Sequence, residues 1–323
     1  MTAAGLTHLL TLAALVVALP PLAVAEKSAL PDVRMSLKQV SPHVYYVEGA
    51  AGVATDNAGF VSNAGFVVTD EGVVVFDALG TPALAARFVE LISSVTEQPV
   101  RFVVLSHFHA DHAYGLQVFK DLGAEILASP GARDYLSVPL ATERLAERRV
   151  SLAPWVNQQT RLVMPDRLID GDYHFALGQH AFVVSNLGAA HSEGDMTLFV
   201  EPDNVLFSGD IIFEGRIPFL GSANTKNWLA TLRHMQDLKV AALIPGHGPA
   251  RENPQDMLAL TTRYLAYMRE QIGKAVEEWV PFDEAYEQID WDEFIEYPAF
   301  VEANRRNAYA VYLSLEAEAL QKK

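Results

Sequence analysis

The chain contains no cysteine among its 323 residues, so it forms no disulfide and offers no thiolate to a metal ion or to catalysis. Positive charge is scarce, because 24 lysine and arginine residues face 40 aspartate and glutamate residues, a formal net charge of −16. Nucleic acid and anionic membrane surfaces favour the opposite sign, so we expect neither as a partner. A Gly-x-Ser-x-Gly elbow, a P-loop and a dinucleotide fingerprint are also missing, which argues against serine hydrolases, NTPases and dehydrogenases.

No run of membrane-spanning length occurs in the sequence. Residues 1–25 carry no Lys, Arg, Asp or Glu, and residues 9–19 form an apolar run broken only by Thr11, which is too short to cross a bilayer. Two prolines and a small-x-small pattern at residues 23–25 follow, as in a cleavable secretory signal. We predict a signal peptide at residues 1–25 and a periplasmic or secreted protein that leaves the membrane after cleavage, with an uncleaved anchor as the alternative.

The rest of the chain alternates strand and helix patterns. Hydrophobic residues make up 50% and charged residues 20%, which is typical of a globular protein with a large core. Strands are predicted at residues 44–47, 65–68, 73–76, 100–105, 126–128, 182–184, 196–200, 205–207 and 241–244, the first three as a meander. Helices are predicted from Thr81 and Pro82, from the histidine-rich turn to Gly123, over residues 130–150 and from Asn224. Residues 251–323 are predicted to be a helical C-terminal extension.

A cluster of metal-ligand side chains directly follows the predicted strand at residues 100–105. It comprises His107, His109, Asp111 and His112. Side chains two apart in an extended segment point the same way, so His107 and His109 can reach one ion. Asp111 and His112 lie where the chain turns into the next helix, and they can face a second ion. The spacing therefore predicts a metal site.

Three more candidates lie in glycine-containing loops that follow or join predicted strands: His191, Asp210 and His247. Alone, each is more often a turn residue or a cap. Their common position at strand ends, where α/β folds place their chemistry, favours the metal interpretation. Seven ligands suffice for two ions that share a water molecule. We predict His107, His109 and His191 at one ion, Asp111, His112 and His247 at the other, and Asp210 between them.

The box at residues 107–112, followed by His191, Asp210 and the Pro-Gly-His-Gly segment at His247, resembles the metallo-β-lactamase superfamily. The resemblance covers roughly residues 35–250 and implies an α/β fold, a four-layer αββα sandwich with two metal ions at one edge of its sheets. An aspartate at position 210 is similar to the glyoxalase II type of dinuclear hydrolase. Asp77 resembles a strand-end aspartate that orients the site, and the alternative is a turn residue before the Pro82 helix.

The segment from residue 214 to 224, the signal and the helical tail are similar to exported zinc metallohydrolases of the quinoprotein-relay or sulfur-oxidation type. We predict a hydrolase that binds two Zn²⁺ ions and cleaves the carbonyl group of a small-molecule thioester, lactone, ester or amide, with Asp111 and Asp210 as catalytic residues. The alternatives are an iron-dependent persulfide dioxygenase and a non-catalytic metal-binding accessory protein of a periplasmic redox system. Imidazole and carboxylate ligands suit zinc, iron and manganese alike.

Substrate-binding candidates are few. The glycine- and alanine-rich loop at residues 49–59 is expected to line the cleft, and Arg216 or Lys226 is expected to hold an anionic group. The remaining histidines have no comparable context, and no role is predicted for His8, His43, His174, His180 and His234. The sequence makes no prediction of the oligomeric state.

Overall fold

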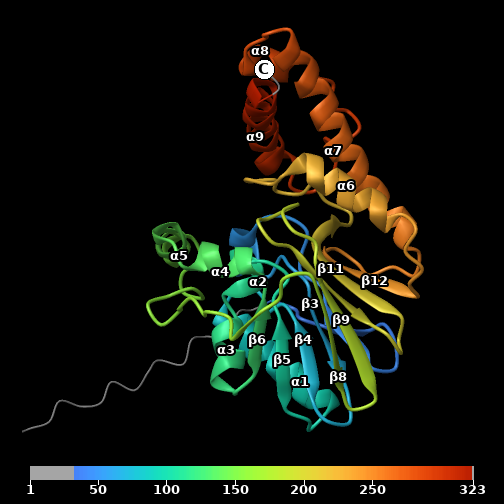
Figure 1. Ribbon diagram of the computed structural model, residues 1–323. Helices are drawn as coiled ribbons and strands as arrows, with labels where there is room; N and C mark the ends of the chain where they lie inside the picture. Colours follow the sequence, from blue (N-terminus) through green and yellow to red (C-terminus); the bar gives the residue numbers. More distant parts are fainter. Residues whose placement is uncertain (1–32, 322–323) are drawn as a thin grey trace, which may run out of the picture.

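The computed structural model describes residues 33–321, so the predicted signal peptide lies outside the described residues. Two sheets pack face to face (Figure 1). The first contains, in spatial order, β1 (Leu37–Gln39), β2 (Val44–Val47), β3 (Ala64–Val68), β4 (Val73–Phe76), β5 (Val100–Val104), β6 (Glu125–Ala128) and β7 (Arg167–Leu168). The second has the order β12 (Ala242–His247), β11 (Val205–Phe213), β10 (Met196–Val200), β9 (His180–Asn186), β8 (Asp172–Leu177).

Strand direction places the chain's loops at one edge of the sandwich. Strands β1 to β4 pair antiparallel, which confirms the predicted meander, whereas β4 to β7 run parallel. In the second sheet β8 to β11 pair antiparallel and β11 pairs parallel with β12. Parallel neighbours end at the same sheet edge. The predicted ligands lie in the loops after β5 and β9 and in the carboxyl-terminal parts of β11 and β12. These segments are therefore found at the same edge of the sandwich.

Helices cover both outer faces of the sandwich. Helices α1 (Pro82–Val95) and α3 (Leu116–Asp121) pack on the first sheet, where Phe66, Phe88 and Phe119 are buried together. Helices α6 (Thr225–Met235) and α7 (Pro254–Glu277) pack on the second sheet through a core that includes Trp228 and Tyr264. A third apolar cluster lies between the two sheets. These layers confirm the predicted αββα sandwich (Figure 1).

One predicted helix is wrong in its extent. The sequence predicts a single helix from the histidine-rich turn to Gly123, but the chain forms α2 (Ala110–Ala113) and then α3. Between them the Gly115 N–H donates to the Leu79 carbonyl at 3.0 Å instead of extending α2. A Cβ atom on Gly115 would lie 1.8 Å from the Ala78 carbonyl oxygen, so this close approach requires glycine. Strand β8 was not predicted because its side chains are only partly buried and its pattern is weakly hydrophobic.

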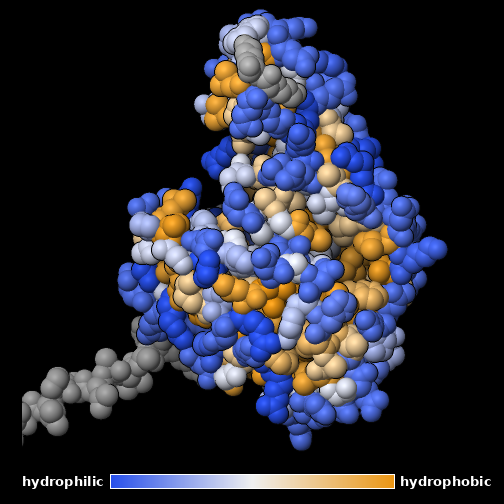
Figure 2. All heavy atoms as spheres, viewed as in Figure 1, coloured by the Kyte–Doolittle hydropathy of each residue, from blue (hydrophilic) through white to orange (hydrophobic). Residues whose placement is uncertain are grey.

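The remaining elements surround the ligand-bearing edge. A short 3-10 helix at Ala54–Asp56 lies in the predicted loop at residues 49–59, and α4 (Pro130–Leu136) and α5 (Pro139–Ser151) form the predicted helical insertion. Figure 1 shows α7, α8 (Phe282–Gln288) and α9 (Phe300–Gln321) extending as an arm beyond this edge. Hydrophilic residues cover most of the arm in Figure 2. No helix within residues 33–321 has the length and apolar character needed to cross a membrane.

The arm is tied to the sandwich by buried polar contacts. Asn307 of α9 donates to the Pro218 carbonyl at 2.7 Å and accepts from the Leu220 N–H at 2.9 Å. Its amide also donates to the Tyr264 hydroxyl at 2.9 Å, which in turn donates to Asn304 at 2.9 Å. Helix α9 therefore holds the loop between β11 and α6 in place. We propose that the chain divides into the sandwich at residues 35–250 and the helical C-terminal extension at residues 251–323.

Candidate metal centre

All seven predicted ligand residues meet at one edge of the sandwich. Their ligand atoms form two groups, and those within each group lie within 4.8 Å of one another. The first group is His107, His109, His191 and Asp210, and the second is Asp111, His112 and His247. Four of these residues lie in the turn after β5 and are close in sequence. The other three come from the second sheet, where the pairing of β9 to β12 brings them together.

In the first group three imidazole nitrogens converge on one point. His109 Nδ1 lies 2.9 Å from both His107 Nε2 and His191 Nε2. Asp210 Oδ2 lies 3.3 Å from His191 Nε2 and 3.7 Å from His107 Nε2. Ligands of a tetrahedral zinc ion with bonds of about 2.1 Å are roughly 3.4 Å apart. The separations observed are thus close to the edges of such a tetrahedron.

The second group is arranged around the carboxylate of Asp111. Its Oδ2 atom lies 3.3 Å from His247 Nε2 and 3.6 Å from His112 Nε2. The Asp210 carboxylate also reaches this group, with Oδ1 at 3.2 Å from His112 Nε2 and Oδ2 at 3.4 Å from His247 Nε2. Asp210 therefore contacts members of both groups and lies between them, as the sequence predicts.

Hydrogen bonds behind the ligands orient their rings. His112 Nδ1 lies 2.8 Å from Asp77 Oδ2, and His247 Nδ1 lies 2.7 Å from the Val61 carbonyl. Because these oxygens accept, each Nδ1 carries a proton, and Nε2 is the nitrogen that each ring turns toward the centre. Asp77 also accepts from the N–H and hydroxyl of Ser106, at 2.7 and 2.8 Å. The Asp77 backbone lies in the left-handed region, with φ of 62°. Its carboxylate orients the His112 ring through this contact, which is the role that the resemblance implies.

The electrostatics of the centre favour bound cations. Burial lowers the pKa of His191 to about 3, so this imidazole is neutral. Burial opposes ionisation of Asp210, but the adjacent imidazoles of His247 and His112 outweigh it and hold the pKa of Asp210 well below its usual range. Burial lowers the pKa of His112 as well, yet the carboxylates of Asp210, Asp77 and Asp111 raise it well above its ordinary value. This concentration of carboxylates attracts positive charge.

The donor set fits divalent metal ions. Among residues 33–321, the buried atoms His112 Nε2 and Asp210 Oδ1 lack a hydrogen-bond partner although both face the centre. Buried polar atoms normally have partners, and a cation is one. Imidazole and carboxylate without thiolate suit Zn²⁺, iron and manganese. The residues present therefore fit two divalent ions.

Glycine allows the ligand loops to approach one another closely. A Cβ atom on Gly246 would lie 2.0 Å from Asp210 Oδ1, inside van der Waals contact. Gly209 adopts a φ of 53°, and a Cβ atom there would lie 2.7 Å from that of Ser106. A side chain at either position would push β11 or β12 away from the centre.

Sequence reasoning missed Asn63, which holds the His247 loop. The Asn63 side chain is buried and donates to the carbonyls of Pro245 and Gly248, at 2.8 and 2.7 Å. It accepts from the Gly49 N–H at 3.1 Å, and its own N–H donates to the Gly246 carbonyl at 2.7 Å. Asn63, in the loop directly before β3, thus holds the end of β12 in place. A lone asparagine between predicted strands carries no signal that would have revealed this role.

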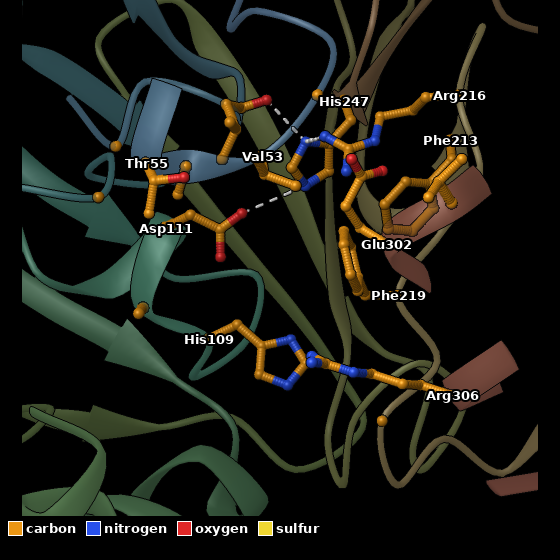
Figure 3. Close-up of a pocket in the computed structure, with 18 of the residues that line it drawn as sticks. Val53, Thr55, His109, Asp111, Phe213, Arg216, Phe219, His247, Glu302 and Arg306 are labelled. Atoms are coloured by element: carbon orange, nitrogen blue, oxygen red, sulfur yellow. Dashed lines mark hydrogen bonds and ion pairs between the residues drawn. The ribbon is translucent and has the colours of Figure 1, made fainter. Parts of the chain in front are cut away.

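A cavity of about 1250 Å³ opens onto the centre. Its inner wall includes His109, Asp111, His191 and His247, and the loop residues Gly52 to Thr55 line one side, as predicted for that loop. Figure 3 shows Asp111 and His247 facing each other, with Arg216 beside His247. Arg216 is predicted as an anion ligand and is 3% exposed in this lining, whereas Lys226 does not belong to it.

The opposite wall comes from elements to which sequence reasoning assigned no site. Arg148 from α5 and Glu302, Arg305 and Arg306 from α9 line the cavity. Arg306 points into it on the side of His109 (Figure 3). In Figure 2 the outline of the molecule is indented between α5 and the arm. The arginine pair in a strongly acidic tail is the signal that could have indicated this wall.

An αββα sandwich with a histidine- and aspartate-rich centre at its edge defines a class of metal-dependent proteins. The chain belongs to the metallo-beta-lactamase superfamily, whose family pattern matches residues 57–247. It is 26% identical over 212 residues to the metallo-beta-lactamase type 2 of Elizabethkingia meningoseptica, covering 64% of this chain and 77% of that protein. It is 28% identical over 157 residues to an acyl-coenzyme A thioesterase of Gallus gallus, covering 45% of this chain and 55% of that protein.

Solved structures share the fold. A metallo-beta-lactamase from Pontibacter korlensis matches with a TM-score of 0.58 and 22% identity, over 72% of this chain and 99% of that chain. The sec-alkylsulfatase Pisa1 from Pseudomonas sp. matches with a TM-score of 0.66 and 17% identity, over 86% of this chain and 50% of that chain. The fold is therefore that of the superfamily.

Proposed function

We propose that this protein is an exported, metal-dependent hydrolase that cleaves the carbonyl group of a small-molecule thioester, lactone, ester or amide. The position of Asp210 between two groups of converging ligands carries the proposal, because one carboxylate in contact with both groups suits a pair of ions. Two divalent ions, most simply Zn²⁺, supply Lewis-acid polarisation and lower the pKa of water when bound.

The ligand residues differ in burial and therefore in the role that we propose for each. His107 and His112 are fully buried and fix the back of the centre, whereas the Asp111 side chain is 26% exposed and faces the cavity. Burial opposes ionisation of Asp111, but His112 and His247 outweigh it and lower its pKa, so Asp111 stays a carboxylate at neutral pH. A substrate entering from the cavity therefore meets Asp111 and His109 first. We propose Asp111 and Asp210 as the catalytic residues.

Arginine side chains in the cavity indicate an anionic substrate. Arg148, Arg216 and Arg306 line it in a chain whose net charge is −16. Neither Arg148 nor Arg306 forms an ion pair within residues 33–321, so both are available to a ligand. Arg305 differs, because it pairs with Asp283 at 2.6 Å. Guanidinium groups bind carboxylate and phosphate oxygens well. We propose that the substrate carries such a group at the end remote from the scissile bond.

An acyl-coenzyme A is a thioester with anionic phosphates, and one relative is an acyl-coenzyme A thioesterase. It is accordingly the first substrate to test, beside an uncharged thioester, lactones, simple esters and a β-lactam. We expect turnover of an anionic carbonyl compound by protein that holds two metal ions per chain. One iron per chain together with oxygen uptake would support a dioxygenase instead. Two bound ions with no turnover across this panel would support an accessory protein.

Two substitutions separate the parts of the proposal. Asp210→Ala should lose both tight metal binding and turnover, whereas Asp237→Ala, an exposed control on the α6 side, should change neither. Arg306→Gln should raise KM for the anionic substrate roughly tenfold, the effect of losing about 1.4 kcal/mol of binding, with little change in kcat. Arg233→Gln, an exposed arginine of α6, is its control. Equal KM values in both arginine variants would contradict an anion site at α9.

Export is tested on the protein isolated from cells. We propose that the segment 1–25 is removed, so N-terminal sequencing of the mature protein should begin at Glu26. A mature chain that begins at Met1 would refute cleavage without affecting the proposed chemistry.

A further inference from the structure

A second group of metal-ligand side chains lies outside the catalytic centre. His43, His180 and Asp203 place one ligand atom each within 4.8 Å of one another. His43 Nδ1 is 3.3 Å from both Asp203 oxygens, and His180 Nε2 is 3.5 Å from Asp203 Oδ2. The two imidazole rings meet edge to face, with centroids 4.4 Å apart. These separations are similar to those within the catalytic centre.

His180 supplies an independent indication of a ligand. Its side chain is only 7% exposed, and neither ring nitrogen has a hydrogen-bond partner in the described part of the chain. Leaving both nitrogens of a buried imidazole unpaired is costly, of the order of 1 to 3 kcal/mol per group. A cation between Nε2 and Asp203 would satisfy one of them.

A hydrogen bond and burial fix the position of the Asp203 carboxylate. The Ser41 hydroxyl donates to Asp203 Oδ1, and the same hydroxyl accepts from the Val44 N–H at 3.1 Å. The Asp203 side chain is 2% exposed, whereas that of His43 is 46% exposed. The group is therefore built from a fixed carboxylate and a buried imidazole, with one accessible imidazole at its solvent side.

We propose that His43, His180 and Asp203 form a second metal site that takes one divalent transition-metal ion, such as Zn²⁺. Two imidazoles and a carboxylate are a common zinc ligand set and leave a position for solvent. The site is distinct from the catalytic centre, because Asp203 precedes β11 whereas Asp210 lies toward its other end, roughly 20 Å away at 3.3 Å per strand residue.

The placement of the three residues defines what the ion would do. His43 lies in the turn between β1 and β2 of the first sheet. His180 begins β9, and Asp203 lies in the turn between β10 and β11, both in the second sheet. An ion bound here would join the two sheets at the end of the sandwich opposite to the cavity. An ion that binds only the folded state raises the free energy of unfolding, so the role of this site is structural.

The test compares wild-type holoenzyme with His43→Gln. His43 is half-exposed, so the variant should fold, and His174→Gln on neighbouring β8 removes an exposed histidine outside the group. Each protein is dialysed against micromolar free Zn²⁺, and its metal content is measured by mass spectrometry. We expect one zinc ion fewer per chain in His43→Gln than in wild type and His174→Gln. Turnover should be equal in all three, because the catalytic ligands are untouched.

Thermal unfolding provides the second readout. Raising Zn²⁺ beyond saturation of the catalytic centre should raise Tm of wild type and His174→Gln but leave Tm of His43→Gln unchanged. Equal zinc contents in wild type and His43→Gln would overturn the proposal and leave the three residues as a histidine–aspartate ion pair. Loss of zinc together with turnover in His43→Gln would also overturn it, because the lost ion would then belong to the catalytic centre.

Discussion

Replacing Asn63 by alanine tests whether the clamp on the His247 loop positions the metal centre. The substitution removes three side-chain hydrogen bonds, two to the carbonyls of Pro245 and Gly248 and one from the Gly49 N–H. At about 1 kcal/mol for each bond, the free energy of unfolding should fall by about 3 kcal/mol. For a chain of this length, 1 kcal/mol changes Tm by roughly 1.6 °C, so Tm should fall by about 5 °C.

The clamp should also affect the metal ions. Residues that position a metal-ligating side chain from behind typically contribute roughly 10- to 100-fold to metal affinity or activity. In Asn63→Ala we therefore expect the affinity for the ion held by Asp111, His112 and His247 to fall by that factor, and turnover at limiting metal to fall with it. Equilibrium dialysis and initial rates measured over a series of free Zn²⁺ concentrations would show both effects.

Asn304→Ala is the matched control. Asn304 is equally buried, but its two hydrogen bonds, with the hydroxyls of Tyr264 and Tyr286, lie within the C-terminal arm. Its loss should lower stability by about 2 kcal/mol and Tm by about 3 °C without changing metal content. If Asn63→Ala loses stability yet binds both ions as tightly as Asn304→Ala, the reasoning about the clamp is wrong.

Three further perturbations probe the packing and the ions. Gly246→Ala should abolish tight metal binding, because the new Cβ atom would lie 2.0 Å from Asp210 Oδ1. The far-ultraviolet circular dichroism spectrum should stay native, and an unchanged metal content would contradict this reasoning. Phe88 is a fully buried residue of α1, so Phe88→Ala should lower stability by about 3 to 5 kcal/mol and Tm by roughly 5 to 8 °C, with turnover per folded molecule preserved. Val150→Ala, at an 82% exposed position, is its control in calorimetry. Chelation should lower Tm reversibly, with recovery on Zn²⁺ addition, since ions that bind only the folded state stabilise it; a Tm indifferent to chelator would refute bound ions.

The local pattern at residues 107–112 was sufficient to predict four of the seven ligand residues of the centre. Consecutive residues of one turn must lie close in space whatever the rest of the fold does, so the spacing of His107, His109, Asp111 and His112 is already geometric information. His191, Asp210 and His247 followed from their place after or between predicted strands, because parallel neighbours end at one edge. The helix start at Thr81 was equally local, and Thr81 Oγ1 does accept from the Leu84 N–H at 3.1 Å.

Contacts between distant segments were not predictable in this way. Asn63 holds a loop more than 180 residues further along the chain, and its own neighbours in sequence say nothing of that partner. His43 and His180 were assigned no role because their proximity depends on how the two sheets pack. The arginines of α9 belong to a helix that buries one face, but Asn304 and Asn307 lie on that face, so the hydrophobic pattern does not show which element the helix packs against.

Local sequence was enough to predict the ligand-bearing turn at residues 107–112 and most strands and helices, because turns, caps and hydrophobic patterns depend on neighbours a few positions apart. It did not predict β8 or the break between α2 and α3. The packing of distant segments, in contrast, brings Arg306 of α9 to the cavity wall and brings His43, His180 and Asp203 together. Such contacts depend on strand register and on the packing of the layers, because a shift of one residue turns a side chain to the opposite face of its sheet.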